Sequence, residues 1–283
     1  MINLQSDVTS LWVQSNLRKS NVALNSSIEK LSTGYRINHA SDNAAILSIS
    51  KQIQSQISGN RVAIDNAQIG YNMLSVADES LDKMQDIAGK IRDLSLQAMT
   101  GTYSSVERAM IQQEVNQRVD ELYRQKNTTT FNNIKVFGEA ETPESAAAAG
   151  SGGITLQIGA NSGSDYQLTI NTEFQLGQHT FDVSTQEAAA TTLGEIDSIL
   201  SNLSSQRSNC GSQQSVVSDV ADSLTSRNIN LQSSYSSLMD TDYAEETARY
   251  TKAMIMQNTN AALLIQMNTK ADIALSLLTN LRS

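Results

Sequence analysis

The amino-acid sequence predicts a mainly α-helical protein, in which both chain ends form a long antiparallel, coiled-coil-like rod and a small β-hairpin region lies in the middle. Three observations support this fold class. Apolar residues recur every seven residues near the chain ends. Pro143 is the sole proline, so helices elsewhere meet no proline break. Aromatic residues make up only 5% of the 283 residues, so the helices must pack mainly through small and aliphatic side chains.

The first 130 residues have the pattern of a helix interrupted twice. Leu17, Leu24 and Leu31 form an apolar stripe on a first helix that should end near Gly34. A second helix, from about Asp42, continues as a heptad rich in small residues, which predicts close packing. Its two registers are Ala67, Leu74, Leu81 and Ala88, and Gly70, Ala77, Met84, Ile91 and Ala98. After a break at residues 101–105, Ser105 opens a third helix that we expect to fold back on the second.

The chain changes character between Phe131 and Phe181, an interval that holds all four phenylalanines and half of the 14 glycines. Residues 154–158 and 166–170 alternate apolar and polar side chains around a turn-rich segment, so they predict a β-hairpin. Helical periodicity returns from Leu193 and again at Val216, Val220, Leu224 and Leu231. A last helix begins near residues 240–242, where aspartates can cap it, and runs close to Ser283.

Charge is unevenly distributed along the chain. The formal net charge is −9, and no Lys or Arg occurs between Lys135 and Arg207, an interval that carries the whole acidic excess. A protein without a basic surface is not expected to bind nucleic acid. Neutral chain ends can stack on identical copies without long-range repulsion. A merely solvated acidic loop accounts for the middle equally well.

Cysteine usage and hydropathy exclude further classes. Cys210 is the only cysteine, so no internal disulfide and no cysteine-based metal cluster can form. The N-terminus lacks the basic and apolar regions of a secretory signal. Apolar runs such as residues 261–265 are too short to span a bilayer. We therefore expect no membrane insertion, and a cytoplasmic protein unless a dedicated machine exports it.

The sequence offers little for catalysis. His39 and His179 are the only histidines, and neither lies in a His-Glu-x-x-His motif, so a surface or packing role is expected for each. Asp240 and Asp242 are better explained as a helix cap than as an acid–base pair. We expect no enzymatic activity, no catalytic residue, no metal site and no cofactor.

Residues 31–45 resemble the spoke segment of the bacterial flagellins, which joins the inner and outer rods of that family. Asn43 stands where a second Asp is usual, and Ile46 where Gly is usual. The positions that match the spoke are Gly34, Arg36, Ile37, Asn38 and Asp42.

Four further segments resemble the same family in the same order. Residues 91–98 and 111–122 are similar to its next two helices, and residues 240–246 to the start of its terminal helix. Residues 131–136 are similar to the entry to its strands, with Asn133 replacing a customary Gly. The ordered set covers nearly everything outside about residues 138 to 192 and is specific because it occurs at both ends of the chain.

The resemblance implies a structural subunit that polymerises into a flagellar filament used for motility. Residues 1–40 and 243–283 would form an inner core of terminal helices, and residues 41–242 an outer rod, including the hairpin and a short variable region at 131–192. The large outward domains of many flagellins would be absent. The apolar stripes of the terminal helices would serve both intramolecular packing and contacts between subunits through Leu4, Leu11, Leu17, Leu24, Ile28, Leu31, Ile255, Ala262, Ile265, Ile273, Leu277 and Leu281.

The resemblance also implies partners and a location. The chain would be exported unfolded through the flagellar type III apparatus, after an export chaperone has held its C-terminal helix. It would then form a helical homopolymer outside the cell and meet hook-filament junction and cap proteins. A periplasmic filament of the spirochaete kind is a less favoured alternative, suggested by residues 101–115.

Contacts with a host Toll-like receptor would fall on Arg92, Leu94 and Glu114. Lys90 and Gly89 depart from the family pattern beside them. Arg and Lys are not equivalent at bidentate contacts, so a purely structural role for these rod residues is slightly favoured.

Two other functions stay open at this point. A hook-filament junction protein shares the terminal helices, and a coiled-coil adaptor would form only small oligomers. For a filament subunit we predict terminal helices that are disordered in the monomer and ordered in the assembly. A narrow apolar seam does not by itself offset an ordering cost of roughly 1 to 2 kcal/mol per residue.

Overall fold

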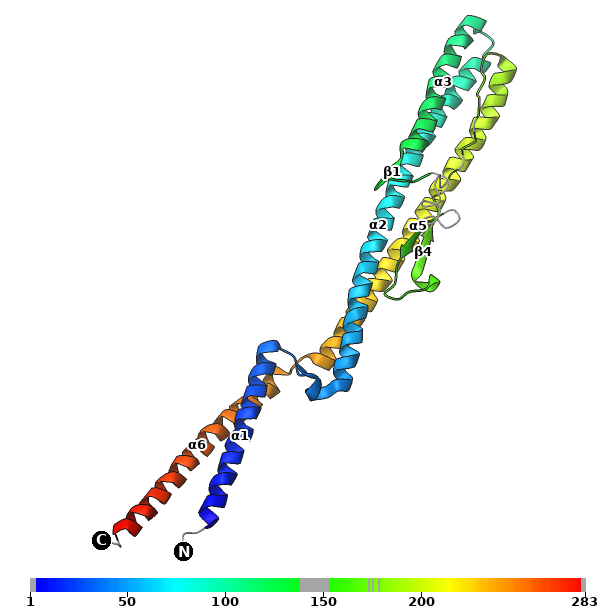
Figure 1. Ribbon diagram of the computed structural model, residues 1–283. Helices are drawn as coiled ribbons and strands as arrows, with labels where there is room; N and C mark the ends of the chain where they lie inside the picture. The colour runs from blue at the N-terminus through cyan, green and yellow to red at the C-terminus, as the bar shows by residue number, and fades with distance from the viewer. Residues whose placement is uncertain (1–3, 138–152, 173, 175, 178, 281–283) are drawn as a thin grey trace. The chain divides into compact units, whose positions relative to one another are not determined.

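The computed structural model describes residues 4–137, 153–172, 174, 176–177 and 179–280. It confirms the predicted fold class. The helices are α1 (Leu4–Thr33), α2 (Ala40–Met99), α3 (Ser105–Thr128), α5 (Gln186–Met239) and α6 (Tyr243–Asn280) (Figure 1). Short strands form two antiparallel pairs, β1 (Thr130–Phe131) with β2 (Ile134–Lys135) and β3 (Ile154–Gln157) with β4 (Gln167–Ile170).

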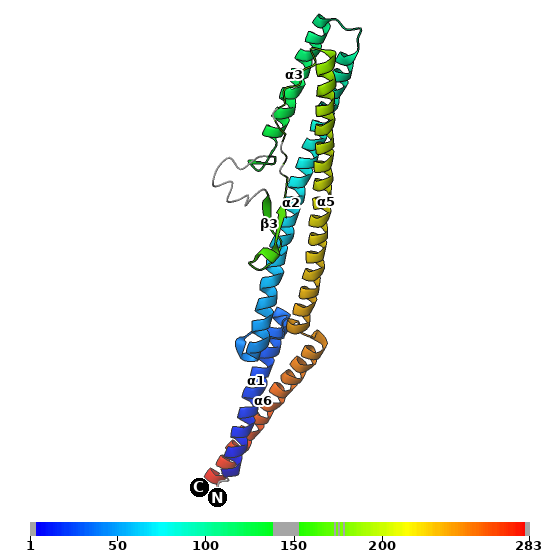
Figure 2. The ribbon, with the colours of Figure 1, turned by 90° about the vertical axis from the view of Figure 1, so that its right-hand side faces the viewer.

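The chain divides into two compact units. Residues 1–55 and 231–283 form the first, called the terminal unit below, and residues 56–230 form the second, called the central unit. In the terminal unit α1 lies alongside α6, and in the central unit α2, α3 and α5 run side by side (Figures 1 and 2).

The core of the central unit follows the predicted heptad of α2. Both registers are buried along its length, and the seam extends beyond the predicted residues to Asn60 and Ala63 at one end and includes Ser95 near the other. Small residues in this seam let the facing helix approach closely. On α5 the buried partners repeat with the same spacing, at Ile196, Leu203, Cys210, Val217 and Leu224. The residue that faces the core is Val217, which is buried. The expected Val216 is nearly half exposed.

Ion pairs and polar bonds fix the antiparallel register of α2 and α5. Arg207 on α5 binds Asp78 through Nε at 3.0 Å and Asp82 and Gln85 through Nη1. Gln85 donates to Ser204 at 2.8 Å, and Arg92 donates to Asp197 at 2.6 Å. Beside this network the thiol of Cys210 is buried, and desolvation, with the nearby charge of Asp78, raises its pKa to about 11. The thiol therefore stays protonated at neutral pH.

The third helix begins at Ser105, as predicted, and the residue before it is its cap. Ser104 is the N-cap: its hydroxyl accepts from the N–H of Glu107, while the Glu107 carboxylate accepts from the N–H of Ser104 at 2.7 Å. This reciprocal capping box satisfies two otherwise unpaired backbone donors. As predicted, α3 returns along α2, burying Ile111, Val115 and Leu122 in the shared core.

The predicted hairpin is β3–β4, with Ile154 opposite Ile170 and Gln157 opposite Gln167. It packs on α2 where Gly70 leaves room, since a Cβ on Gly70 would lie 2.1 Å from Leu156 Cδ1. Asn66 of α2 donates to the carbonyl of Gln157 at 2.9 Å. On the other side, Gln213 of α5 exchanges two hydrogen bonds with the backbone of Asn171. The hairpin therefore bridges α2 and α5.

A second, smaller hairpin, β1–β2, was not predicted as such. Its turn residues Asn132 and Asn133 have φ values of 49° and 65°. Asn tolerates this left-handed conformation better than other non-glycine residues. Asn133 can therefore occupy a position where the resembling family usually has Gly.

Candidate assembly surface

The seam between α1 and α6 is largely polar. The buried residues of α1 are Val13, Ser20 and Ser27, and those of α6 are Glu246, Ala253 and Asn260, each set spaced by seven residues. Asn260 Nδ2 donates to Ser20 Oγ at 3.2 Å, and Gln257 Nε2 donates to Asn21 Oδ1 at 2.7 Å. The sequence interpretation followed apolar residues and therefore missed this seam, although the heptad spacing of Val13, Ser20 and Ser27 is visible in the sequence.

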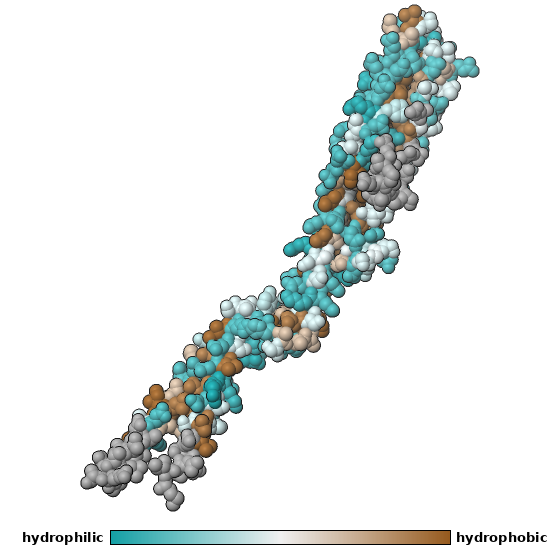
Figure 3. All heavy atoms as spheres, in the orientation of Figure 1, coloured by the Kyte–Doolittle hydropathy of each residue, from teal (hydrophilic) through white to brown (hydrophobic). Residues whose placement is uncertain are grey.

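The predicted apolar stripes lie mostly away from this seam. Leu11, Ile255 and Ile265 are 58%, 57% and 66% exposed, and Ile28, Ala262 and Ile273 are exposed as well. Leu17, Leu24 and Leu31 are half-buried. Brown, apolar side chains are accordingly visible on the surface of the terminal unit in Figure 3. Leu4 and Leu277 are helical, but their side-chain environments lie outside the structural description, as does Leu281 altogether.

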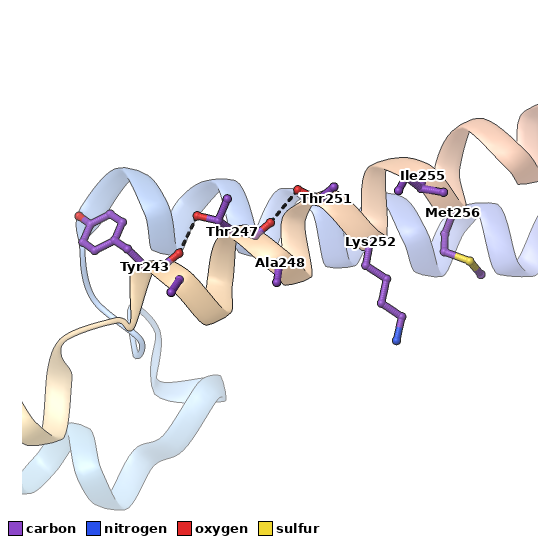
Figure 4. Close-up of a pocket in the computed structure, with 8 residues that line it drawn as sticks. Tyr243, Thr247, Ala248, Thr251, Lys252, Ile255 and Met256 are labelled. Carbon is purple, nitrogen blue, oxygen red and sulfur yellow. Dashed lines mark hydrogen bonds between the residues drawn. The ribbon is translucent and has the colours of Figure 1, made fainter.

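An open groove runs along one face of α6. Figure 4 shows its lining, from Tyr243 through Thr247 and Thr251 to Ile255 and Met256. The threonine hydroxyls are occupied by the helix itself: Thr247 donates to the carbonyl of Tyr243 at 2.6 Å, and Thr251 to that of Thr247 at 2.9 Å. What the groove offers to another molecule is therefore mainly apolar surface.

The five spoke residues come together within the terminal unit. Gly34 ends α1 with a φ of +75°, and its carbonyl accepts from the N–H of Thr241 at 2.9 Å. Arg36 donates its N–H to the carbonyl of Met239 at 2.7 Å and its guanidinium to that of Leu238 at 2.8 Å. Ile37 is buried. The spoke thus joins the residues that follow α1 to those that precede α6.

Asp42 and Asn43 organise the start of α2. Asp42 Oδ2 accepts from the N–H groups of Asn38 and His39, both at 3.0 Å, and these bonds hold the pKa of Asp42 below its usual value. Asn43 interrupts the helix with φ −167° and ψ 98°, and its Oδ1 accepts from the N–H of Ile46 at 3.1 Å. Asn43 therefore acts as an N-cap, a role that Asn fills as well as the Asp usual in the resembling family.

The three candidate receptor residues lie in the central unit. Arg92 is held by Asp197, Glu114 pairs with Arg118 at 3.3 Å, and Leu94 is partly buried against the core. The two charged groups are thus already bound within the chain.

The histidines and paired aspartates have structural partners. His39 Nε2 lies 2.8 Å from Glu29, and His179 stacks on Phe181 with ring centroids 5.7 Å apart. Asp242 caps α6 by accepting from the N–H of Ala244 at 2.8 Å, and Asp240 accepts from Ser236 instead. In the described part of the chain no His, Cys, Asp and Glu side chains cluster as metal ligands would. Over the same residues, no helix is both long and apolar enough to cross a bilayer.

Two long terminal helices with a polar seam and outward apolar residues, together with a helical bundle that carries small hairpins, are typical of helical structural proteins that assemble through their helices. Comparison with known families agrees. Residues 5–142 match the bacterial flagellin N-terminal helical region, and residues 193–278 match the bacterial flagellin C-terminal helical region. The chain belongs to the bacterial flagellin family.

Individual relatives extend over nearly the full length. A flagellin of Treponema pallidum is 32% identical over 97% of this chain and 99% of its own. A flagellar filament 30.7 kDa core protein of Treponema maltophilum is 33% identical over the same shares, and a flagellin of Halalkalibacterium halodurans is 31% identical over 89% and 90%. A putative flagellar hook-associated protein of Vibrio parahaemolyticus shares the fold, with a TM-score of 0.54 at 15% identity, covering 70% of this chain and 100% of that one.

Proposed function

We propose that this chain is a structural subunit of a flagellar filament used for motility, and that the apolar faces of α1 and α6 are its polymer contacts. As a flagellin it has a structural role and its place is in a flagellum. The single observation that carries the assignment of contacts is the inverted burial of the terminal unit, with polar residues inside the helix pair and isoleucines outside. The inner core proposed for residues 1–40 and 243–283 falls wholly within this unit.

Energetics support this assignment. Burying one isoleucine side chain contributes about 1.5 to 3 kcal/mol, whereas a hydrogen bond such as Asn260 to Ser20 contributes about 0.5 to 1.5 kcal/mol net. The described seam therefore provides much less stabilisation than the exposed faces could. Contact with neighbouring copies would bury those faces and complete the stabilisation of both helices.

The experiment is polymerisation of variants with a polar residue on the exposed face. Ile255→Asn and Ile265→Asn should each raise the critical concentration for seeded filament growth about tenfold or more, since 1.4 kcal/mol is a factor of ten. Ile255→Leu and Ile265→Leu, which keep the apolar surface at the same positions, are the matched controls and should polymerise nearly normally. Normal growth of both Ile255→Asn and Ile265→Asn would refute the proposed contacts.

The hook-filament junction alternative gains no support. The family models and the curated relatives name flagellins and filament core proteins, and the likeness to the hook-associated protein is one of fold alone. The coiled-coil adaptor alternative predicts that purified subunits stop at small oligomers when filament seeds are added. We also propose that the chain has no catalytic role, in keeping with a structural family.

For location, we propose an external filament, as the spoke and terminal segments suggest. The periplasmic alternative is favoured by a different observation: relatives from Treponema and Brachyspira match this chain over 99% of their own lengths. Antibody labelling of intact cells separates the two, because external filaments are labelled directly. Periplasmic filaments are labelled only after the outer membrane has been opened.

We propose partners for the steps that bring the chain from the cytoplasm into a filament assembled outside it. They are a flagellar export chaperone, the type III export apparatus, and the hook-filament junction and cap proteins that border the polymer. Recognition by a host Toll-like receptor through Arg92, Leu94 and Glu114 would first require Arg92 and Glu114 to exchange their partners Asp197 and Arg118.

A further inference from the structure

Asn60 places an amide in the apolar seam of α2. Its side chain is only 1% exposed, and the next seam residues, Ala63 and Ala67, are apolar and buried. Its Nδ2 has no hydrogen-bond partner within the described chain. A buried donor without an acceptor is unfavourable, and native structures satisfy nearly all such groups.

Asn228 presents the complementary atom on α5. Its Oδ1 is buried and also has no partner within the described chain. Asn228 follows Leu224 by four residues, so the two share one helix face, and Leu224, seven residues after the core residue Val217, is buried. The chain thus holds one orphaned donor on α2 and one orphaned acceptor on α5.

The register of the two helices brings these atoms to the same level. Arg207 lies beside Asp78, and Ser204 lies beside Gln85. Counting outward from these pairs along two antiparallel helices places Asn60 opposite about residues 225 to 229. Asn228 falls in this range, yet the two amides are not directly hydrogen bonded.

We infer that Asn60 and Asn228 bind an internal water molecule between α2 and α5. Water accepts from Asn60 Nδ2 and donates to Asn228 Oδ1, which satisfies both groups at once. A bridge of this kind suits polar groups that face each other beyond direct hydrogen-bond reach. Ala63, the next seam residue, is small and buried, which leaves the space that a water requires.

The water site makes this level of the rod different from the rest of the seam. Between Leu74 and Ile91 the seam is closed by apolar side chains. At Asn60 the two helices are joined by a small, replaceable ligand. The central unit therefore has one hydrated level, at which α2 and α5 can adjust their contact while both amides stay bonded.

Thermal unfolding of the full-length protein tests the inference with Asn60→Leu, Asn228→Leu and the double variant. Each single change removes one side of the bridge and leaves the other amide orphaned, whereas the double change removes both. The Tm of the double variant should therefore be about 2 to 6 °C higher than the sum of the two single shifts in Tm predicts. Additive shifts would overturn the inference.

The matched control is Asn66→Leu, which makes the same substitution six residues along α2. Asn66 already has a partner, the carbonyl of Gln157, so this change should lower the Tm. A second measurement uses protein labelled with ¹⁵N in asparagine. A long-lived water contact to the Asn60 side-chain amide is expected by NMR, and coupled Tm shifts without such a contact would mean a direct bond between the amides and would overturn the water site.

Discussion

At the scale of single residues, the capping box of α3 couples stability to pH. The backbone N–H of Ser104 holds the pKa of Glu107 below its usual value of about 4.3. A carboxyl whose pKa is lower in the folded state binds fewer protons than in the unfolded state. Its stabilisation is complete above the unfolded pKa and is lost as the pH falls through the folded pKa.

The residue-scale prediction is that Glu107→Gln lowers the Tm at pH 7, and that the difference from the unchanged protein shrinks as the pH falls below the unfolded pKa and through the lower folded pKa of Glu107. Glu114→Gln, an exposed carboxylate within the same helix, is the control for a general loss of charge. Thermal unfolding between pH 3 and 7 is the measurement. A difference of constant size across this range would contradict the role of the carboxylate.

At the scale of elements, two glycines of α2 have opposite environments. A Cβ on Gly70 would meet Leu156 of the hairpin, whereas a Cβ on Gly89 has nothing within 4 Å. Alanine gains up to about 1 kcal/mol over glycine inside a helix, but forcing an extra methyl into a packed contact costs about 1 to 3 kcal/mol.

We therefore predict that Gly89→Ala stabilises the central unit by up to about 1 kcal/mol and that Gly70→Ala destabilises it. Urea unfolding of both variants checks the signs. Leu156→Ala in the Gly70→Ala background should recover part of the loss if the hairpin is the source of the strain. Equal stabilisation by both alanines would mean that the hairpin does not press on α2.

The sequence was sufficient for elements whose pattern is repeated. The α2 heptad, the return of α3 and the alternation in β3 and β4 each rest on several residues, so a single exception does not change the prediction. Details that depend on one residue were less predictable. Val216 and Val217 are both apolar, so only the rotation of α5 decides which one is buried.

The spacing of the polar seam is visible in the sequence, but its burial in place of the apolar stripes could not be predicted, for a physical reason. Hydrophobic periodicity identifies a face that will be buried, but it does not say by what. In a subunit with strong external contacts, the apolar face can belong to the neighbours and a polar face to the partner helix. Leu17 and Ser20 lie one turn apart on α1, and only the placement of α6 assigns them their roles.

At the scale of the whole molecule, the two units should differ in dynamics. The central unit has a continuous apolar core, whereas the terminal unit depends on its polar seam. In dilute monomer, we predict fast amide hydrogen exchange in α1 and α6 and slow exchange from Leu74 to Ile91. In filaments the terminal helices should become protected. Equal protection of both units in the monomer would contradict the incomplete stabilisation of the terminal helices.

The seam of α2 also has a chiral consequence. Its buried positions keep a strict seven-residue spacing from Asn60 through Ala67, Leu74, Leu81 and Ala88 to Ser95. A straight α-helix drifts by about 20° per heptad from such a repeat, so over these five heptads α2 must wrap around α5 by roughly 100° in a left-handed sense. Each subunit therefore has a defined supercoil handedness before it contacts another copy.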